Sequence, residues 1–320
     1  MNNHAMSRLQ EAGLRNGPLC VGLDTDPSYL PNSVLTAFDS PAQAVLAYNK
    51  AVVSRIAEGS ASGGLAACCK VQIAYYEAMG LAGLASYAET LKAVRRAGMP
   101  VIADVKRGDI ADTARAYARA HFSGDFEADI ITVNPYMGFD TLVPFTDFAR
   151  PENGAKGIFV LLRTSNPGMT DIEKLPLAAA HGIPAGSTVL DRVGAELASI
   201  GRAFSEVYPD ARCSPVGAVV GCTEESDARS LRDAYPDVYF LIPGYGAQGG
   251  AARIAATLLD KAGGTVNSSR GILTAWKKSE ALAAKRDAGT LTLNDIADAA
   301  AEAAAAAKTD LCNAQKLLRG

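Results

Sequence analysis

The chain has 320 residues, of which 48% are hydrophobic and 20% are charged, and its formal net charge is −3. This length and apolar content suit one large α/β domain or two ordinary domains. A nearly neutral charge without a basic stripe argues against a general nucleic-acid binder, and no apolar stretch is long enough to span a membrane.

The N-terminus and the cysteines indicate the compartment. The first 17 residues are polar and contain no apolar core of a signal peptide, so we expect no secretory signal and a cytoplasmic location. The six cysteines form no CxxC pair and histidine is scarce, so we expect reduced thiols, no structural zinc site and no Ser-His-Asp triad. These residues are Cys20, Cys68, Cys69, Cys213, Cys222 and Cys312, with His4, His121 and His181.

Short apolar runs alternate with stretches of helical spacing along the whole chain. In chain order they predict a helix at Ser7–Asn16, a strand at Leu19–Asp24, a helix at Ala44–Glu58, a strand at Ala67–Gln72, a helix at Glu77–Ala97, a strand at Val101–Lys106, a helix at Ile110–His121, strands at Asp129–Asn134 and Ile158–Arg163, a helix at Ser187–Val207, a strand at Pro215–Gly221, a helix at Glu224–Ala234, a strand at Val238–Ile242, a helix at Gly250–Ala262 and a weak strand at Thr265–Ser268. The Ala-rich tail after them predicts one or two surface helices.

Eight short strands, each followed by helical sequence and separated by no linker, are typical of a (β/α)₈ TIM barrel. We therefore predict a single domain over residues 1–320, with the barrel core at about 18–274 and helical additions at the N-terminus and in the tail at about 275–320. A doubly wound open sheet is the alternative. It would require a glycine-rich phosphate loop after the first strand, and Gly22-Leu23-Asp24 lacks that pattern.

The segment Val101–Ile110 (VIADVKRGDI) contains a conspicuous group of charges inside an apolar strand. Asp104 and Lys106 are two residues apart, so they lie on the same side of that strand. Buried charges are costly unless they are paired. The segment is therefore either a structural ion pair, with Asp109 as the N-cap of the next helix, or a charge array built for chemistry. It does not decide between the two by itself.

Polar residues recur where the predicted strands end, and in a barrel these ends form the active site. They are Asp24, Lys70, Asp104, Lys106, Asn134, Thr164, Ser165, the loop 243–250 and the segment 268–271. Each has a structural alternative: Asp24 could cap a turn, Lys70 could extend to the surface, and the residues from Ser165 onward could form an ordinary turn. That all of these positions lie at one end favours a functional site.

The last two strand ends predict a phosphate site. TIM barrels commonly bind phosphate there, with backbone N–H groups of glycine-rich loops and a helix N-terminus. Gly246, Gly249 and Gly250 permit close approach of the backbone, Gln248 can donate hydrogen bonds, and Arg270 can hold a phosphate with two N–H groups.

From Leu19 to Arg270 these motifs resemble the orotidine 5′-phosphate decarboxylase family, in its longer bacterial branch. The most specific match is Asp104-Val105-Lys106-Arg107-Gly108-Asp109-Ile110, which fits the family's D-x-K-x-x-D-I signature and is followed by Thr113. Further matches are Lys70 in KVQIAYYE, the segment RTSNPG at 163–168, PGYGAQGG at 243–250 and Ser269-Arg270.

The resemblance implies a cofactor-free and metal-free lyase that forms UMP from orotidine 5′-phosphate in pyrimidine biosynthesis. It implies a homodimer with active sites at the interface and no nucleic-acid or membrane partner. The catalytic residues would be Lys70, Asp104, Lys106 and Asp109, and the substrate-binding residues would be Asp24, Thr113, Ser165, Gln248 and Arg270. Asp109 and Thr113 would enter the neighbouring subunit's site, and their i, i+4 spacing at a helix start predicts one common face.

Two other functions compete with this interpretation. A metal-dependent relative on the same barrel, such as 3-hexulose-6-phosphate synthase, shares D-x-K-x-x-D but uses Mg²⁺; Arg107, Ile110, Thr113 and Thr164-Ser165 favour the decarboxylase. A non-catalytic nucleotide-binding barrel is the second rival. A binder has no need of a lysine crowded by carboxylates, which argues against it.

Overall fold

The computed structural model describes residues 3–59, 63–179, 184–222, 224–246 and 249–319. Eight parallel strands close into a barrel in the order of the chain, β1 to β8, and β8 pairs with β1. The strands are β1 (Leu19–Gly22), β2 (Cys68–Gln72), β3 (Val101–Arg107), β4 (Ile130–Val133), β5 (Gly157–Arg163), β6 (Val216–Val220), β7 (Phe240–Ile242) and β8 (Gly264–Ser268). The predicted (β/α)₈ barrel is confirmed, and the open-sheet alternative is wrong.

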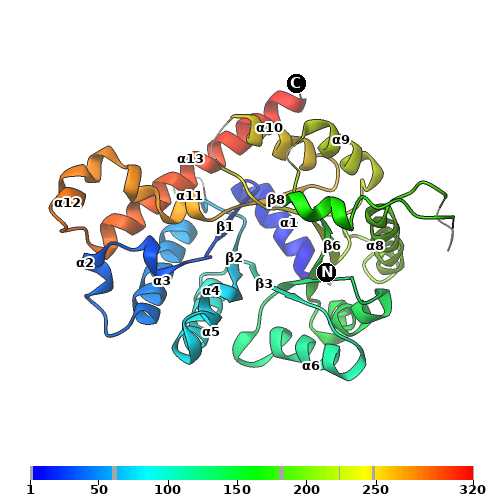
Figure 1. Ribbon diagram of the computed structural model, residues 1–320, viewed down its shortest axis with the longest axis horizontal. Coiled ribbons are helices and arrows are strands. Elements are labelled where there is room, and N and C mark those ends of the chain that lie inside the picture. Colours follow the sequence, from blue (N-terminus) through cyan, green and yellow to red (C-terminus); the bar gives the residue numbers. More distant parts are fainter. Residues whose placement is uncertain (1–2, 60–62, 180–183, 223, 247–248, 320) are drawn as a thin grey trace.

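Helices surround the barrel (Figure 1). The α-helices are α1 (Ala5–Asn16), α2 (Asn32–Leu35), α3 (Pro41–Glu58), α4 (Ile73–Glu77), α5 (Gly80–Arg96), α6 (Ala111–Phe122), α7 (Val143–Thr146), α8 (Val189–Ser205), α9 (Glu225–Ala234), α10 (Gly249–Leu258), α11 (Arg270–Leu273), α12 (Ala283–Asp287) and α13 (Leu293–Arg319). Short 3₁₀ helices lie at Pro27–Tyr29, Gly124–Phe126, Phe139–Leu142, Asp147–Ala149, Pro151–Asn153, Pro167–Asp171, Ala275–Lys278 and Glu280–Leu282. Within the described ranges no helix combines the length and apolar character needed to cross a membrane.

Alternation along the strands separates two apolar layers. Residues on the outer face of each strand, such as Val21, Val71 and Val101, pack into the core beneath the surrounding helices. Residues on the inner face, such as Cys68 and Ile102, fill the barrel interior. Because side chains alternate with period two, the next inward positions along β2 and β3 are Lys70 and Asp104. The same strands therefore provide an apolar floor and a charged upper layer.

The helix α1 closes the end of the barrel where the strands begin. Its residues Met6 and Leu9 are fully buried in the same apolar cluster as the inward side chains. The backbone N–H of Ala5 donates to the carbonyl of Ala155 just before β5, at 2.7 Å, and Gln10 donates to the carbonyl of Ala262 just before β8, at 2.8 Å. Helix α1 therefore closes the end of the barrel where the strands begin, and the end where the strands finish is open.

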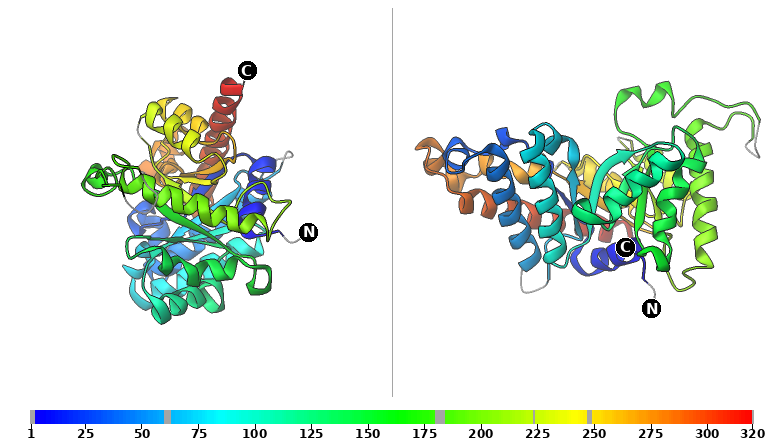
Figure 2. Two further views of the ribbon diagram at one scale, coloured as in Figure 1. Left: turned by 90° about the vertical axis from the view of Figure 1, so that its right-hand side faces the viewer. Right: turned by 90° about the horizontal axis from the view of Figure 1, so that it is seen from below.

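The tail is more deeply integrated than the sequence predicts. Helix α13 is coloured red in Figures 1 and 2 and contacts α3, α10, α11 and β1. Its residues Ile296, Ala300, Ala304 and Leu311 are fully buried. The tail is helical, as the sequence predicts, and one face of α13 belongs to the main core.

Candidate active site

Four charged side chains meet at the open end of the barrel. Lys70 comes from β2, Asp104 and Lys106 come from β3, and Asp24 follows β1 by two residues. The ammonium of Lys70 lies 3.0 Å from Oδ1 of Asp24 and 2.9 Å from Oδ2 of Asp104. The ammonium of Lys106 lies 2.6 Å from Oδ1 of Asp104. Positive and negative groups therefore alternate in the order Asp24, Lys70, Asp104, Lys106.

Asp104 is at the centre of this array and accepts four hydrogen bonds. Oδ1 accepts from Lys106 and from the hydroxyl of Thr132, at 2.9 Å, and Oδ2 accepts from Lys70 and from the amide of Gln72, at 3.1 Å. A carboxylate offers about four acceptor positions, so all of them are used. The carboxylate is held in one orientation with its charge compensated.

The protonation states follow from the competition between burial and the neighbouring charges. Burial by itself would raise the pKa of the Asp104 carboxyl, but Lys70 and then Lys106 lower that pKa to about 2. Burial opposes the charge of Lys70 as well, and the carboxylates of Asp104 and Asp24 outweigh it, so the pKa of Lys70 lies above its ordinary value. Asp104 is an anion and Lys70 a cation at neutral pH.

Lys106 projects into the mouth from an unusual backbone. Its φ of 44° lies in the left-handed region, and the pairing of β3 with β4 shifts register between Ala103 and Arg107. Because of the shift, two backbone N–H groups lack a partner in the strand ladder. The hydroxyl of Thr132 accepts a hydrogen bond from each, from the N–H of Val105 at 3.0 Å and from the N–H of Lys106 at 2.9 Å. The side chain of Lys106 is 46% exposed, whereas that of Lys70 is 5% exposed. Lys106 is therefore the ammonium that a substrate in the mouth can reach.

Three further residues organise the array, and the sequence assigned a supporting role to none of them, although Ser269 was among the polar residues at the strand ends. Thr132 and Gln72 hold Asp104, and the hydroxyl of Ser269 donates to Oδ2 of Asp24 at 2.7 Å. Thr132 could have been found, because it is the polar residue at an inward position of an otherwise apolar strand. The position of Ser269 also explains Gly22: a Cβ there would lie 1.9 Å from the Ser269 hydroxyl oxygen.

The predicted binding residues lie around the same mouth. Ser165 is exposed in the loop after β5, and a Cβ on Gly221 after β6 would come within 3.0 Å of the Cβ of Ser165. Arg270 is exposed at the start of α11, directly after β8. Gln248 lies outside the described residues. Asp24 is closely paired with Lys70 and Ser269 in the structure.

Asp109 and Thr113 lie apart from this array. The nearest polar contact of the Asp109 carboxylate is the N–H of Ile110, at 2.8 Å, and among the described residues no Lys, Arg or His nitrogen lies within 4.0 Å of it. The N-cap of α6 is Ile110, so the alternative of Asp109 as N-cap is wrong. The expected i, i+4 alignment is wrong too, because α6 begins at Ala111, whose φ of 44° separates Asp109 from the helix.

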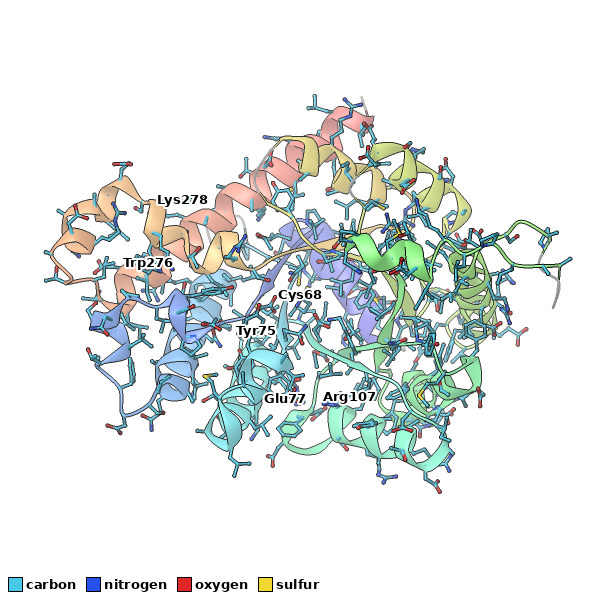
Figure 3. All side chains as sticks on the ribbon, viewed as in Figure 1. Cys68, Tyr75, Glu77, Arg107, Trp276 and Lys278 are labelled. Carbon is cyan, nitrogen blue, oxygen red and sulfur yellow. The ribbon has the colours of Figure 1, made fainter. Side chains whose placement is uncertain are left out.

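Exposed apolar side chains lie on the two loops that follow β3 and β4. Ile110, next to Asp109, is 55% exposed, and Tyr136 and Met137 are 78% and 51% exposed. The two loops touch, since the N–H of Asn134 donates to the carbonyl of Arg107 at 2.8 Å. Nη2 of Arg107 in turn lies 3.8 Å from Oε1 of Glu77 on α4, and Figure 3 labels both side chains. Two touching loops on this side of the mouth therefore expose apolar side chains.

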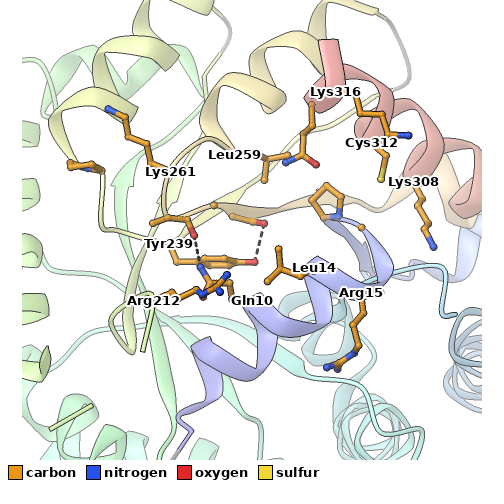
Figure 4. A pocket seen from close by; sticks show the side chains of 18 of the residues that line it. Gln10, Leu14, Arg15, Arg212, Tyr239, Leu259, Lys261, Lys308, Cys312 and Lys316 are labelled. Atoms are coloured by element: carbon orange, nitrogen blue, oxygen red, sulfur yellow. Dashed lines mark hydrogen bonds between the residues drawn. The ribbon is translucent and has the colours of Figure 1, made fainter. Parts of the chain in front are cut away.

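A separate cavity of about 970 Å³ lies at the opposite end of the barrel, between α1, α13 and the starts of β1 and β8 (Figure 4). Its lining includes Leu14, Pro18, Tyr239, Leu259 and Lys308. None of the predicted site residues lines it. The charged array and this cavity are therefore distinct features.

A closed barrel whose mouth carries alternating, hydrogen-bonded lysine and aspartate side chains defines a TIM-barrel enzyme with a preorganised charged site. A sequence description of the orotidine 5′-phosphate decarboxylase / HUMPS family matches residues 17–285. The chain belongs to this family, and the resemblance inferred from its motifs is confirmed.

Individual relatives agree with the family match. The chain is 48% identical over 274 residues to an orotidine 5′-phosphate decarboxylase of Clostridium botulinum (strain Loch Maree), which covers 85% of this chain and 90% of that one. It is 47% identical, with the same coverage, to one of Clostridium perfringens. These relatives identify the chain as an enzyme of the carbon–carbon lyase class.

Solved structures show the same architecture. OMP decarboxylase from Leishmania donovani aligns with a TM-score of 0.63 at 30% identity, over 92% of this chain and 99% of that one. The decarboxylase of Plasmodium berghei aligns with a TM-score of 0.74 over 99% of this chain and 100% of that one. At 15% identity the second likeness concerns the fold alone.

Proposed function

We propose that this enzyme decarboxylates orotidine 5′-phosphate to UMP by means of the charges of its own side chains, with no cofactor and no metal. The observation that carries the proposal is Asp104, held between Lys70 and Lys106 at the open end of the barrel. Family membership and the names of the clostridial relatives support the substrate.

The chemistry follows from where the charges are fixed. Asp104 would face the carboxylate of the substrate, and two such charges about 4 Å apart repel by about 4 kcal/mol at an effective dielectric constant of ~20. The bond between C6 and the carboxylate breaks, CO₂ leaves, and the electron pair stays on C6. Lys106 stabilises that carbanion and then donates its Nζ proton to C6, which gives UMP. Since the charges are in place beforehand, no reorganisation is required during the reaction.

The other predicted residues bind the substrate in this proposal. Asp24 and Lys70 bind the ribose hydroxyls, Ser165 and Gln248 bind the base, and Gln248 and Arg270 bind the phosphate. Support comes from the exposed positions of Ser165 and Arg270 after β5 and β8. Binding energy from the distant phosphate can then be used to hold the base against Asp104.

We also propose a homodimer in which each site receives Asp109 and Thr113 of the partner subunit. Asp109 is not held in its own chain's array. Ile110 next to it is exposed, and so are Tyr136 and Met137 on the touching loop after β4. An exposed apolar patch of this kind is typical of a protein interface. The added carboxylate would continue the alternation of charges next to Lys106. A cytoplasmic location completes the proposal and is supported by six free cysteines.

The first experiment follows the absorbance of orotidine 5′-phosphate with purified protein in excess EDTA. The wild type is expected to turn over, and a requirement for added Mg²⁺ would favour the metal-dependent rival. Lys106→Ala should lower kcat by at least about 10³-fold, because both the proton donor and the stabilising charge are removed. UMP binding should be largely retained, and the exposed Lys278→Ala serves as the control.

The second experiment tests the shared site. Lys106→Ala and Asp109→Ala should each be inactive alone. Mixed dimers would have one site with an intact Lys106 and an intact Asp109 of the partner subunit, so random reassortment should restore about a quarter of wild-type activity. Failure of the two variants to complement after co-refolding, with dimers present, would refute the shared site.

A further inference from the structure

The loop after β7 is attached to the C-terminal helix by a side-chain contact. The geometry points to α13 as the support of this loop, with Tyr245 and Asp310 as positioning residues for the end of the site that holds the substrate phosphate. The loop here means residues 243–246, and the inference rests on the proposed function, because it takes Arg270 to bind that phosphate.

The backbone of Tyr245 is fixed to β8. Its N–H donates to the carbonyl of Asn267 at 3.2 Å, and the hydroxyl of Ser268 donates to its carbonyl at 3.2 Å. Asn267 and Ser268 lie directly before Ser269 and Arg270. The position of Tyr245 therefore sets where the loop lies relative to Arg270.

The side chain of Tyr245 points away from the mouth and into the protein. Only 7% of the residue is exposed, and its hydroxyl donates to Oδ2 of Asp310 on α13. Among the described residues no Lys, Arg or His nitrogen lies within 4.0 Å of the Asp310 carboxylate, so this hydroxyl is its polar partner. This hydrogen bond attaches the loop to α13.

Helix α13 is itself well anchored. Asp298 pairs with Arg55 of α3 at 2.5 Å, and Lys308 donates to the carbonyl of Gly64 at 2.9 Å. Ile296 and Leu311 are fully buried. Asp310 therefore sits on a rigid element and can fix the loop rather than follow it.

Helix α10, which follows β7 in the chain, packs against the same helix. It starts at Gly249, and α10 and α13 lie side by side in Figure 1 and are in contact. Both contribute buried small residues, Ala252 and Ala255 from α10 and Ala304 from α13, which permit close packing. Helix α13 thus contacts both Tyr245 and α10, although it lies beyond the residues 17–285 that match the family.

This support should lower the entropic cost of binding phosphate, because the backbone of Tyr245 is already fixed close to Arg270 and loses less freedom when the ligand arrives. The effect should be confined to ligands that carry the phosphate. Asp310→Ala and Tyr245→Phe are each expected to weaken UMP binding about tenfold and to leave uridine binding unchanged. KM for orotidine 5′-phosphate should increase in proportion while kcat is unchanged, and the double variant should be no worse than either single one.

Glu302→Ala is the matched control, since it removes an exposed carboxylate of the same helix. It should leave the affinity for UMP unchanged. An equal loss of UMP affinity in Glu302→Ala, an equal loss of uridine affinity in the Asp310 variant, or unchanged UMP affinity in both loop-contact variants would each overturn the inference.

Arg270→Ala separates this inference from the proposed function. If it weakens UMP binding while the Tyr245 and Asp310 variants do not, the phosphate end is correctly assigned and only the support by α13 is wrong. If Arg270→Ala leaves UMP affinity unchanged, the assigned phosphate end is wrong and the inference fails with it.

Discussion

At the residue scale, Lys106 combines a reactive side chain with an unfavourable backbone. A non-glycine residue with φ of 44° is strained, at a cost of order 1–3 kcal/mol. The hydroxyl of Thr132 compensates in part, because it accepts the two N–H groups that the shifted register leaves without ladder partners. The strain thus occurs at the residue whose ammonium must leave the strand and enter the mouth.

This strain can be measured with two substitutions at one position. Lys106→Gly and Lys106→Ala should both be inactive, yet the glycine variant should be more stable by about 1 kcal/mol, because glycine adopts positive φ without penalty. Urea unfolding at neutral pH gives the difference. At the exposed helical position Lys50 the order should reverse, with alanine about 1 kcal/mol more stable than glycine. The same order at both positions would contradict the left-handed backbone of Lys106.

The sequence predicts the charged residues of the site better than it predicts the residues that hold them by hydrogen bonds. Lys70, Asp104 and Lys106 could be placed at the mouth because period-two alternation in a buried strand leaves few other positions for them. Gln72 and Ser269 could not be assigned, since their roles depend on which side chain of a neighbouring strand lies opposite. The separation of Asp109 from α6 depends on backbone angles at Ile110 and Ala111, and no residue type there indicates them.

At the element scale, the carboxylate of Glu173 ties the start of the long connection between β5 and α8 to the end of β5. Glu173 accepts from the N–H of Thr164 at 3.1 Å and from its hydroxyl at 2.6 Å. The N–H of Leu190, in the first turn of α8, donates to the carbonyl of Glu173 at 2.9 Å. The segment that carries Ser165 is thereby closed into a loop fixed at both ends.

Glu173→Ala should release this loop. We expect a higher KM for orotidine 5′-phosphate, because Ser165 is no longer positioned, and a loss of about 1–2 kcal/mol in unfolding free energy from the lost hydrogen bonds. Steady-state kinetics and urea unfolding measure the two effects. Glu173→Gln keeps an acceptor oxygen and should remain close to the wild type. Equal KM values for the alanine variant and the wild type would show that the loop is ordered by other contacts.

Elements were predictable where the hydrophobic period was clear, and less so where a single backbone angle decides. The predicted helix at Glu77–Ala97 corresponds to α5, which starts only at Gly80, whose φ is 67°, and the separate short helix α4 before it was not predicted. Strand β8 looked weak as an isolated segment, yet it pairs with both β7 and β1. Closure of the barrel supplies partners that a local pattern does not contain.

At the scale of the whole molecule, two buried histidines link stability to pH. His4 ties α1 to the segment before β6, with its Nε2 3.0 Å from the carbonyl oxygen of Cys213, and burial lowers its pKa to about 4. His121 in α6 accepts from Nε of Arg107 at 3.2 Å, and burial followed by the charge of Arg107 lowers its pKa to about 4. Both rings are neutral in the folded protein at pH 7.

The unfolding free energy should therefore fall as pH decreases from about 6.5 to about 4. In this window the unfolded chain takes up protons on these histidines and the folded chain does not, at a cost of up to roughly 3 kcal/mol for each residue. Urea unfolding at several pH values measures the slope. His121→Gln retains an acceptor for Arg107 without titrating, so its slope should be shallower than that of the wild type. An unchanged slope would mean that His121 is protonated equally in both states.

Because α1 closes one end of the barrel, the substrate and the products must all pass through the opening at the other end. Orotidine 5′-phosphate must enter, and CO₂ and UMP must depart, past Asp104 and Lys106. A departing nucleotide therefore blocks an arriving one, and the two can never occupy a subunit together. UMP should therefore be a competitive inhibitor with respect to the substrate. Accumulated product then slows its own synthesis.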